Sequence, residues 1–344
     1  MTVAFVVPPA VVPSGGNTYD ARIAAALGAL GRPVRRVEVP GSWPRPTAAD
    51  RDRLSRELAR LPDGSGALVD GLVACGVPEV VEPHADRLRI VVLVHLPLAD
   101  ETGLPPDEAA ALDARERAVL GMTGVVATSG WAARRLADHH GLARVHHVAP
   151  GTDPAPLAPG TDGVSRLLCV ASVTPRKGHD LLLEALARLD GPWECVCVGP
   201  IGRDAHAEHV RARAGALGVR LTGALTGAAL ESAYSAADLV VLPSRAETFG
   251  MAVTEALARG VPVVAARVGG VPEALGRDAG GGRPGLLVAP EDAVALAASL
   301  RLWLADRDLR ERLRTSARRR RSELAGWKQA ARAMCAVLDQ EGCR

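Results

Sequence analysis

The feature that most constrains the fold of this chain is a regular alternation of short β-branched runs with longer Ala-, Leu- and Arg-rich segments of helical period. In the first half, the runs VAFVV, RIVVLVHL and GVVATS each precede such a segment. In the second half, the runs WECVCVG, ADLVVLPS, VPVVAAR and GLLVA continue the pattern. Strands that alternate with helices are typical of a parallel sheet covered on both faces. The sequence therefore predicts an α/β fold.

One interruption divides this alternation into two parts. A Pro- and Gly-rich stretch covers residues 149–163, and the alternation restarts after it. The chain has 344 residues, and a single hydrophobic core usually stops growing at about 250–300 residues. We therefore expect two doubly wound Rossmann-like domains that face a cleft, at residues 1–155 and 156–320. Because apolar residues recur at helical spacing in residues 321–344, we expect a C-terminal helix there that packs back across the N-terminal domain.

The charge and the cysteines narrow the possible functions. The formal net charge of +2 gives no electrostatic reason to expect a nucleic-acid partner. The six cysteines lack the close C-x-x-C spacing of zinc or redox sites. We interpret them as reduced core residues of a cytosolic protein; they are Cys75, Cys169, Cys195, Cys197, Cys335 and Cys343.

The N-terminus does not resemble a signal peptide. It has no basic region, and Pro8 and Pro9 interrupt its apolar run. No stretch approaches the length of about 18 apolar residues that a membrane-spanning helix needs. The sequence therefore predicts a cytoplasmic protein without integral membrane association, and its oligomeric state leaves no signature in the sequence.

Ligands of open α/β sheets bind outside the carboxyl ends of the strands, so the loops after the strands are the candidate sites. In the first such loop, Gly15 and Gly16 lead from a strand into a helix. Their unhindered backbone N–H groups suit a phosphate, and the alternative is a tight turn of purely steric origin. In a second loop, His95 follows an apolar strand. It is either a catalytic imidazole or a satisfied structural residue.

A third loop carries cations at the start of a helix. Arg176, Lys177 and Gly178 lie between an apolar strand and a helix that begins at about residue 179. Lysine occurs elsewhere in the chain only at Lys328, which favours a functional role for Lys177 over a solvated turn charge. A cation beside a helix N-terminus is suited to hold a diphosphate.

A fourth loop contains two carboxylates around a Phe-Gly pair. Glu247 lies in the loop after the strand ADLVVLPS, and Glu255 lies about a turn and a half into the next helix. The two can therefore contact different parts of one elongated ligand, while Gly250 leaves backbone amides open at the helix start. The alternative interpretation is a capping glutamate followed by a surface glutamate.

With these four loops in place, the chain resembles the retaining glycosyltransferases of family 4, whose two-domain fold is called GT-B. The motifs that carry the resemblance stand in the family's order: the Gly-Gly loop, HLP, ATSGW, APGTD, RKGHDLLLEAL, SRAETFGMAVTEALARGVPVVA, GGVPE and GLLVAPED. Residues 238–288 are the most specific part. The resemblance implies transfer of a sugar from a nucleoside-diphosphate sugar, with UDP favoured, to a hydroxyl of a small-molecule, natural-product or glycan acceptor.

The resemblance also implies roles for individual residues. Glu247 is expected to contact the donor sugar, Glu255 the nucleotide ribose and Lys177 the diphosphate. His95 is expected near the transferred sugar, so the expected catalytic residues are Glu247, His95 and Lys177. The expected donor-binding residues are Gly15, Gly16, Ser172, Arg176, Lys177, Phe249, Gly250, Met251 and Glu255.

One position departs from the family pattern. The family commonly has a Gly-Arg pair at the end of the strand before the Lys177 turn, and this chain has Ala171-Ser172. Either Arg176 replaces the missing cation, or helix dipoles and Lys177 hold the diphosphate without it.

No metal or other cofactor is expected. Fixed cations and helix N-termini can neutralise a leaving diphosphate. The two D-x-D strings, Asp50-Arg51-Asp52 and Asp306-Arg307-Asp308, fall in helical segments. There the two carboxylates of each string point to different faces, so we interpret them as surface charges and not as a chelating pair.

Other classes of function remain as alternatives. A nucleotide-sugar epimerase on the same fold would bind a similar donor, and so would a non-catalytic sugar-nucleotide-binding protein. A Rossmann dehydrogenase is disfavoured because no G-x-G-x-x-G follows the first strand. The basic run Arg318 to Arg321 lies in a helical segment and is interpreted as a solvated face.

Overall fold

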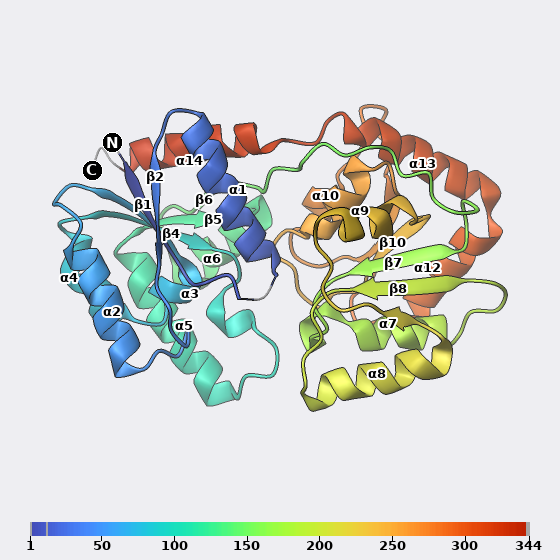
Figure 1. Ribbon diagram of the computed structural model, residues 1–344, viewed down its shortest axis with the longest axis horizontal. Helices are drawn as coiled ribbons and strands as arrows, with labels where there is room; N and C mark the ends of the chain where they lie inside the picture. Colours follow the sequence, from blue (N-terminus) through green and yellow to red (C-terminus); the bar gives the residue numbers. More distant parts are fainter. Residues whose placement is uncertain (1, 12, 342–344) are drawn as a thin grey trace. The chain divides into compact units, whose positions relative to one another are not determined.

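The computed structural model describes residues 2–11 and 13–341. The chain divides into two compact units (Figure 1). Unit 1 combines Met1–Gly151 with Ala325–Arg344, and unit 2 is Thr152–Leu324. The chain therefore passes from unit 1 into unit 2 and later returns.

Unit 1 is built on a six-stranded sheet in the order β2-β1-β3-β4-β5-β6, with every strand pair parallel. Its strands are β1 Val3–Val7, β2 Val34–Glu38, β3 Gly66–Asp70, β4 Arg89–Val94, β5 Gly124–Ala127 and β6 His146–His147. Its helices are α1 Gly15–Ala29, α2 Ala48–Ala59, α3 Gly71–Ala74, α4 Pro78–Ala85, the 3₁₀ helix η1 Leu98–Asp100, α5 Pro106–Gly121, α6 Gly130–His140 and α14 Trp327–Gln340.

Helices cover both faces of this sheet (Figure 1). On one face, α2, α4, α5 and α6 pack on the sheet. On the other face, α1 and α14 pack together, and Ile23 and Met334 are fully buried between these helices and the strands. Strand β1 is buried along its whole length and β4 is buried from its second residue onward, which explains why they contain continuous apolar runs and not alternating ones.

Unit 2 is built on a second parallel sheet, in the order β12-β11-β10-β7-β8-β9. Its strands are β7 Arg166–Val170, β8 Glu194–Val198, β9 Arg220–Leu221, β10 Leu239–Leu242, β11 Val263–Ala266 and β12 Gly285–Val288. Its helices are the 3₁₀ helix η2 Pro175–Lys177, α7 His179–Leu186, α8 Ala205–Leu217, α9 Gly227–Ser235, α10 Met251–Ala258, α11 Val271–Leu275, α12 Ala293–Ala305 and α13 Arg307–Arg321. The predicted α/β class with two doubly wound sheets is confirmed.

The last two helices of the chain belong to different units. Helices α13 and α14 are separated by residues 322–326, and α14 is the helix that lies within residues 321–344. Gly326 is the N-cap of α14 and its backbone is extended, so α13 does not continue through this residue as one helix with α14.

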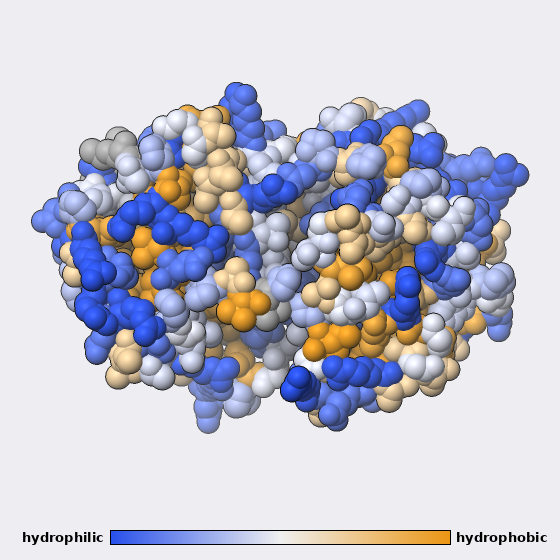
Figure 2. Space-filling model, in the orientation of Figure 1, coloured by the Kyte–Doolittle hydropathy of each residue, from blue (hydrophilic) through white to orange (hydrophobic). Residues whose placement is uncertain are grey.

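The surface is mixed in character. Hydrophilic and hydrophobic residues are interspersed on the visible face of each unit (Figure 2). Among the described residues, none of the helices is both long enough and apolar enough to cross a membrane.

Candidate functional site

The strand order of unit 2 creates a switch point between β7 and β10. From β7 the chain continues to β8 and β9 on one side, and β10, β11 and β12 then extend the sheet on the other side. At such a point, the loops after two neighbouring strands run in opposite directions. They open a crevice at the carboxyl ends of the strands, where doubly wound sheets bind their ligands. The two predicted donor loops, residues 171–178 and 243–250, are the loops that follow β7 and β10.

The loop after β7 folds tightly against the loop after β10. It ends in η2 and then in Gly178, which has a φ of +68° and is the N-cap of α7. A Cβ atom on Gly178 would lie 2.2 Å from the backbone oxygen of Pro243. Both the left-handed backbone and this close approach require glycine, and together they place Lys177 beside the second loop.

Lys177 and Glu247 form an ion pair at the switch point. The distance from Lys177 Nζ to Glu247 Oε1 is 2.6 Å, and Ser244 Oγ donates to the same oxygen at 2.8 Å. The side chain of Glu247 is only 8% exposed. Burial alone would raise the pKa of this carboxyl, but the charge and hydrogen bond of Lys177, helped by Arg176 and Ser244, lower it below its usual value. Glu247 is therefore an ionised carboxylate in a nearly closed environment.

Arg176 contributes a second positive charge near Glu247. Its guanidinium contacts the backbone oxygen of Ala246 at 3.4 Å, and its backbone oxygen accepts a hydrogen bond from the Arg245 N–H at 2.8 Å. Ser172 lies half-buried just after β7, where its carbonyl accepts from the Thr174 N–H. Arg176 therefore contacts the Glu247 loop, whereas position 172, where the family commonly has an arginine, holds a serine.

Arg245 is a residue of this region that the sequence analysis missed. Its guanidinium binds both carboxylate oxygens of Asp180 on α7, at 2.9 and 2.6 Å, and the backbone oxygen of Pro175 at 2.6 Å. It therefore clamps the loop after β10 to the loop after β7. The only signal in the sequence is its place next to Ser244, because Asp180 and Pro175 come from a distant part of the chain.

The Phe-Gly-Met segment begins helix α10 directly after Glu247. Phe249 is buried, Gly250 is the N-cap of α10 and Met251 is its first residue. The Gly270 N–H donates to the backbone oxygen of Glu247 at 3.1 Å, and this hydrogen bond connects the GGVPE motif to the Glu247 loop.

Glu255 does not join the Lys177 pair. Its carboxylate accepts a hydrogen bond of 2.7 Å from the hydroxyl of Tyr234, a residue of α9 that is fully buried. Arg259 stacks over the Tyr234 ring at 4.4 Å and donates to the backbone oxygen of Glu255. Tyr234 thus holds the Glu255 side chain from α9, and Arg259 is the C-cap of α10 itself. Neither residue was predicted from the sequence.

In unit 1, the predicted residues Gly16 and His95 also lie together. Gly15 and Gly16 are the first two residues of α1, after Ser14, whose side chain accepts from the Asn17 N–H. A Cβ atom on Gly16 would lie 3.3 Å from Cδ2 of His95, so glycine gives the imidazole room at the helix start.

Two buried aspartates face His95, and the sequence analysis found neither of them. Nε2 of His95 lies 2.8 Å from Asp20 Oδ1 and 3.8 Å from Asp70 Oδ2. Burial lowers the pKa of His95, but the charge and hydrogen bond of Asp20, with a smaller effect of Asp70, raise it to about 9. Burial raises the pKa of Asp70 to about 7 despite the attraction of His95. At neutral pH His95 is therefore an imidazolium bonded to Asp20.

This cluster has the donor types of a metal site, since one donor atom each from Asp20, Asp70 and His95 lies within 4.8 Å of the others. The hydrogen bond between Nε2 of His95 and Asp20 already uses the ring nitrogen that faces the aspartates. In this arrangement the cluster is an ion pair.

The interpretation of the D-x-D strings as surface charges is wrong for their first members. Asp50 is buried and forms a capping box with Thr47 at the start of α2. Asp306 precedes α13 and is its N-cap, with its carboxylate accepting from the Leu309 N–H. Asp52 and Asp308 are exposed. The buried or capping roles arise because a carboxylate can satisfy free N–H groups in the first turn of a helix.

Comparison with known proteins finds a family model that matches most of unit 2. Residues 161–320 match the family model described as "Glycosyl transferases group 1". Most of unit 2 is therefore similar to the domain that this model describes. This domain contains every predicted donor-binding residue of unit 2, from Ser172 to Glu255.

Two proteins that are similar to this chain are named D-inositol 3-phosphate glycosyltransferase. The chain is 34% identical over 223 residues to the protein from Jonesia denitrificans, and the aligned region covers 57% of this chain and 51% of the relative. It is 36% identical over 230 residues to the protein from Geodermatophilus obscurus, and the aligned region covers 59% of this chain and 50% of the relative. The matched region thus spans about half the length of each relative.

Solved structures share the fold over nearly the whole chain. A sucrose-phosphate synthase from Thermosynechococcus elongatus matches with a TM-score of 0.81 at 21% identity and covers 98% of both chains. HepE from Anabaena, solved in complex with UDP and glucose, matches with a TM-score of 0.74 at 16% identity and covers 98% of this chain and 99% of that one. The predicted GT-B class is confirmed.

Proposed function

We propose that the protein is a retaining glycosyltransferase that transfers a sugar from a nucleoside-diphosphate sugar, with UDP-sugars favoured, to a hydroxyl of a small-molecule, natural-product or glycan acceptor. The observation that carries this proposal is the pairing of Lys177 with Glu247 at the switch point of the unit 2 sheet. A cation and an ionised carboxylate held together there offer one partner to a diphosphate and one to a sugar.

The ion pair suits donor binding because an ammonium group has three hydrogen-bond donors. Lys177 can keep its bond to Glu247 and donate to a phosphate oxygen as well. The N-termini of α7 and α10 lie at the same edge of the sheet and add partial positive charge. In this proposal these fixed groups neutralise the leaving diphosphate, and no metal ion takes part.

Glu247 acts by orienting the sugar and not as a nucleophile. Its carboxylate accepts from sugar hydroxyls and stabilises the positive charge that develops as the glycosidic bond breaks. The acceptor hydroxyl attacks from the side of the leaving group, and the departing phosphate oxygen takes its proton. This order of events retains the anomeric configuration without a covalent intermediate.

Release of the nucleoside diphosphate tests the proposal. The purified protein is first screened for thermal stabilisation by UDP, GDP, ADP and TDP, because a ligand that binds the folded state raises its apparent stability. The matching sugar nucleotide is then supplied with and without acceptors, starting with D-inositol 3-phosphate, the compound in the names of the relatives. We expect nucleoside diphosphate to accumulate only when an acceptor is present.

Two other results would contradict this function. Conversion of the donor sugar without an acceptor would identify an epimerase. Saturable donor binding without turnover on a broad set of acceptors would identify a binding protein that uses the same fold.

A further inference from the structure

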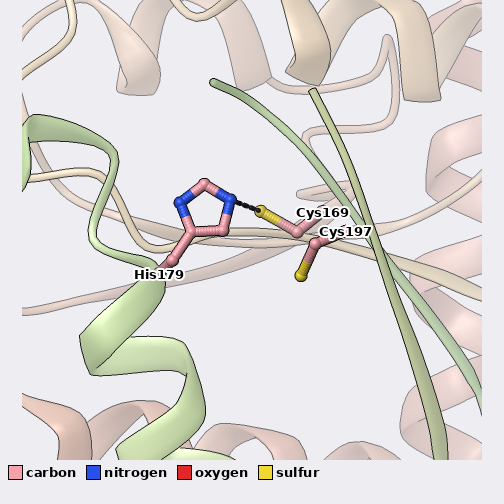
Figure 3. Close-up of side chains that lie close together, drawn as sticks. All are labelled: Cys169, His179 and Cys197. Carbon is pink, nitrogen blue, oxygen red and sulfur yellow. Dashed lines mark hydrogen bonds between the residues drawn. The ribbon is translucent and has the colours of Figure 1, made fainter. Parts of the chain in front are cut away.

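Three soft donor side chains meet in the core of unit 2, away from solvent. Cys169 on β7 and Cys197 on β8 are directly paired in the strand register, so their side chains lie on the same face of the sheet. His179 is the first residue of α7, which packs on that face, and its ring points toward Cys169 (Figure 3). The exposed fractions of these residues are 0%, 3% and 1%.

The distances among the three residues are close to those of a metal site. Nε2 of His179 lies 3.8 Å from Sγ of Cys169, and the donor atoms of all three residues lie within 4.8 Å of one another. In a tetrahedral zinc site, bonds of about 2.3 Å to sulfur and 2.0 Å to nitrogen place neighbouring donor atoms about 3.5–3.8 Å apart. Side-chain movements of about 1 Å or less would therefore complete the geometry.

The imidazole of His179 provides an independent indication. Its Nε2 points toward the sulfur of Cys169 and has only this long contact of 3.8 Å in residues 2–11 and 13–341. A cation bound at Nε2 would give this ring a strong interaction in the direction in which it already points.

Charge balance also favours a divalent ion with this ligand set. Zn²⁺ bound to two thiolates and a neutral imidazole has no net charge, which suits an apolar core such as the one formed by Leu182 and Leu183. Cys169, His179 and Cys197 provide three of the four donors of a closed structural zinc site.

We propose that Cys169, His179 and Cys197 bind one thiophilic d¹⁰ metal ion, with Zn²⁺ as the probe ion. Binding converts two thiols into thiolates and releases two protons, with no change of oxidation state. The ion ties β7, β8 and the start of α7 together directly behind the Lys177 turn. Its role is structural, so it is separate from the proposed sugar transfer and from any catalytic metal.

Refolding in the presence of metal tests the site. The protein is unfolded with a chelator present, refolded with or without Zn²⁺ and freed of unbound metal by gel filtration. We expect about one equivalent of retained zinc per chain and a higher melting temperature, by the linkage between binding and folding. With Cd²⁺ in place of Zn²⁺, we expect the ultraviolet charge-transfer band of a cadmium–thiolate bond.

Matched variants locate the ion. Cys75→Ser changes a buried cysteine of unit 1 and should leave the zinc content and the cadmium band unchanged. Cys169→Ser/Cys197→Ser should lose both signals, and His179→Gln should weaken metal binding at least tenfold, a typical effect of losing one group at a metal site. The proposal is overturned if the wild-type protein shows no thiolate band, or if the double variant keeps its zinc. Because the cadmium band is measured on the wild-type protein, a variant that does not fold leaves the test valid.

Discussion

At the scale of single residues, Lys177 is the side chain on which the proposed chemistry most depends. Negative charge develops on the diphosphate as the glycosidic bond breaks, so a cation that contacts it stabilises the transition state more than the bound donor. We expect Lys177→Ala to lower turnover by about a hundredfold or more. Initial rates at saturating donor measure this loss, and a melting curve checks the fold, since the variant leaves Glu247 buried without its partner.

Arg176 is the control for Lys177. If Arg176 replaces the cation absent at Ser172, then Arg176→Ala should be nearly as slow as Lys177→Ala, and Ser172→Arg should partly rescue it. If Arg176 only neutralises Glu247 in the free protein, its loss should be mild. Normal turnover of Lys177→Ala would remove the diphosphate from this loop.

For Glu255, the structure offers a variant that separates ligand binding from internal hydrogen bonding. We expect Glu255→Ala to raise the donor Michaelis constant more than it lowers turnover, because contact with the ribose is equally strong in the ground state and the transition state. Tyr234→Phe removes the hydrogen bond to Glu255 but keeps the carboxylate. It should change the donor Michaelis constant far less. Equal effects of both substitutions would assign Glu255 to the support of α9.

His95 makes stability depend on pH in a defined window. Its pKa is raised from a usual value of about 6.5 to about 9, so its ion pair stabilises the fold fully below pH 6.5 and this contribution is lost as the pH rises through 9. The shift corresponds to a loss on the order of 3 kcal/mol. Asp70, whose pKa is raised to about 7, favours the folded state below about pH 4. This contribution is lost as the pH rises from about 4 to 7.

Urea denaturation at pH 7 and pH 9.5 measures the His95 contribution. The wild-type protein should lose stability between these two values, whereas His95→Gln should lose much less. Asp20→Asn removes the partner of the imidazolium and should flatten the same interval. A wild-type curve that is equally flat would show that the imidazole is neutral at pH 7.

At the scale of elements, the packing of α14 on α1 predicts a large effect of a single core substitution. Met334 is fully buried between these helices and the unit 1 sheet. Met334→Ala should lower the free energy of unfolding by about 2–5 kcal/mol, because it removes contacts and leaves a cavity. Arg332→Ala on the exposed side of the same helix is the control, and urea denaturation should show a change within about 0.5 kcal/mol.

At the scale of the whole molecule, the proposed mechanism predicts that added divalent cations do not affect the reaction. EDTA given to the folded enzyme should leave initial rates unchanged, and Mg²⁺ or Mn²⁺ should not raise them, because Lys177 and two helix N-termini supply the positive charge. A zinc ion held by Cys169 and Cys197 would be out of reach of the chelator during a short assay, since both residues are buried. A rate lost to EDTA and restored by Mg²⁺ would contradict this mechanism.

The sequence was sufficient to predict the two sheets and the loops of the site, because strand ends and helix starts are local features. It was not sufficient to predict which side chains meet. Asp20 is one of 39 acidic residues, and only the close approach of α1 to the end of β4 brings it to His95, which is 75 positions away. Arg245 and Asp180 likewise meet only because β7 and β10 are neighbours in the sheet.

Cys169, His179 and Cys197 illustrate the same limit. Zinc motifs recognised in a sequence place pairs of ligands close together along the chain. Here the ligands come from two strands and a helix, and only the register of β7 with β8 brings the two thiols together.

The two crossings of the chain between its units also determine the order in which the protein can be completed on the ribosome. Unit 2 is one continuous segment, whereas unit 1 lacks α14 until residues 327–340 have been synthesised. At about 5–20 residues per second, synthesis of Thr152–Leu324 takes roughly 10–35 s. During that time the apolar surface of α1 that later covers Met334 has no partner. Unit 1, whose synthesis begins first, is therefore completed only after unit 2, and nascent chains stalled before Ala325 should be the form on which chaperones act.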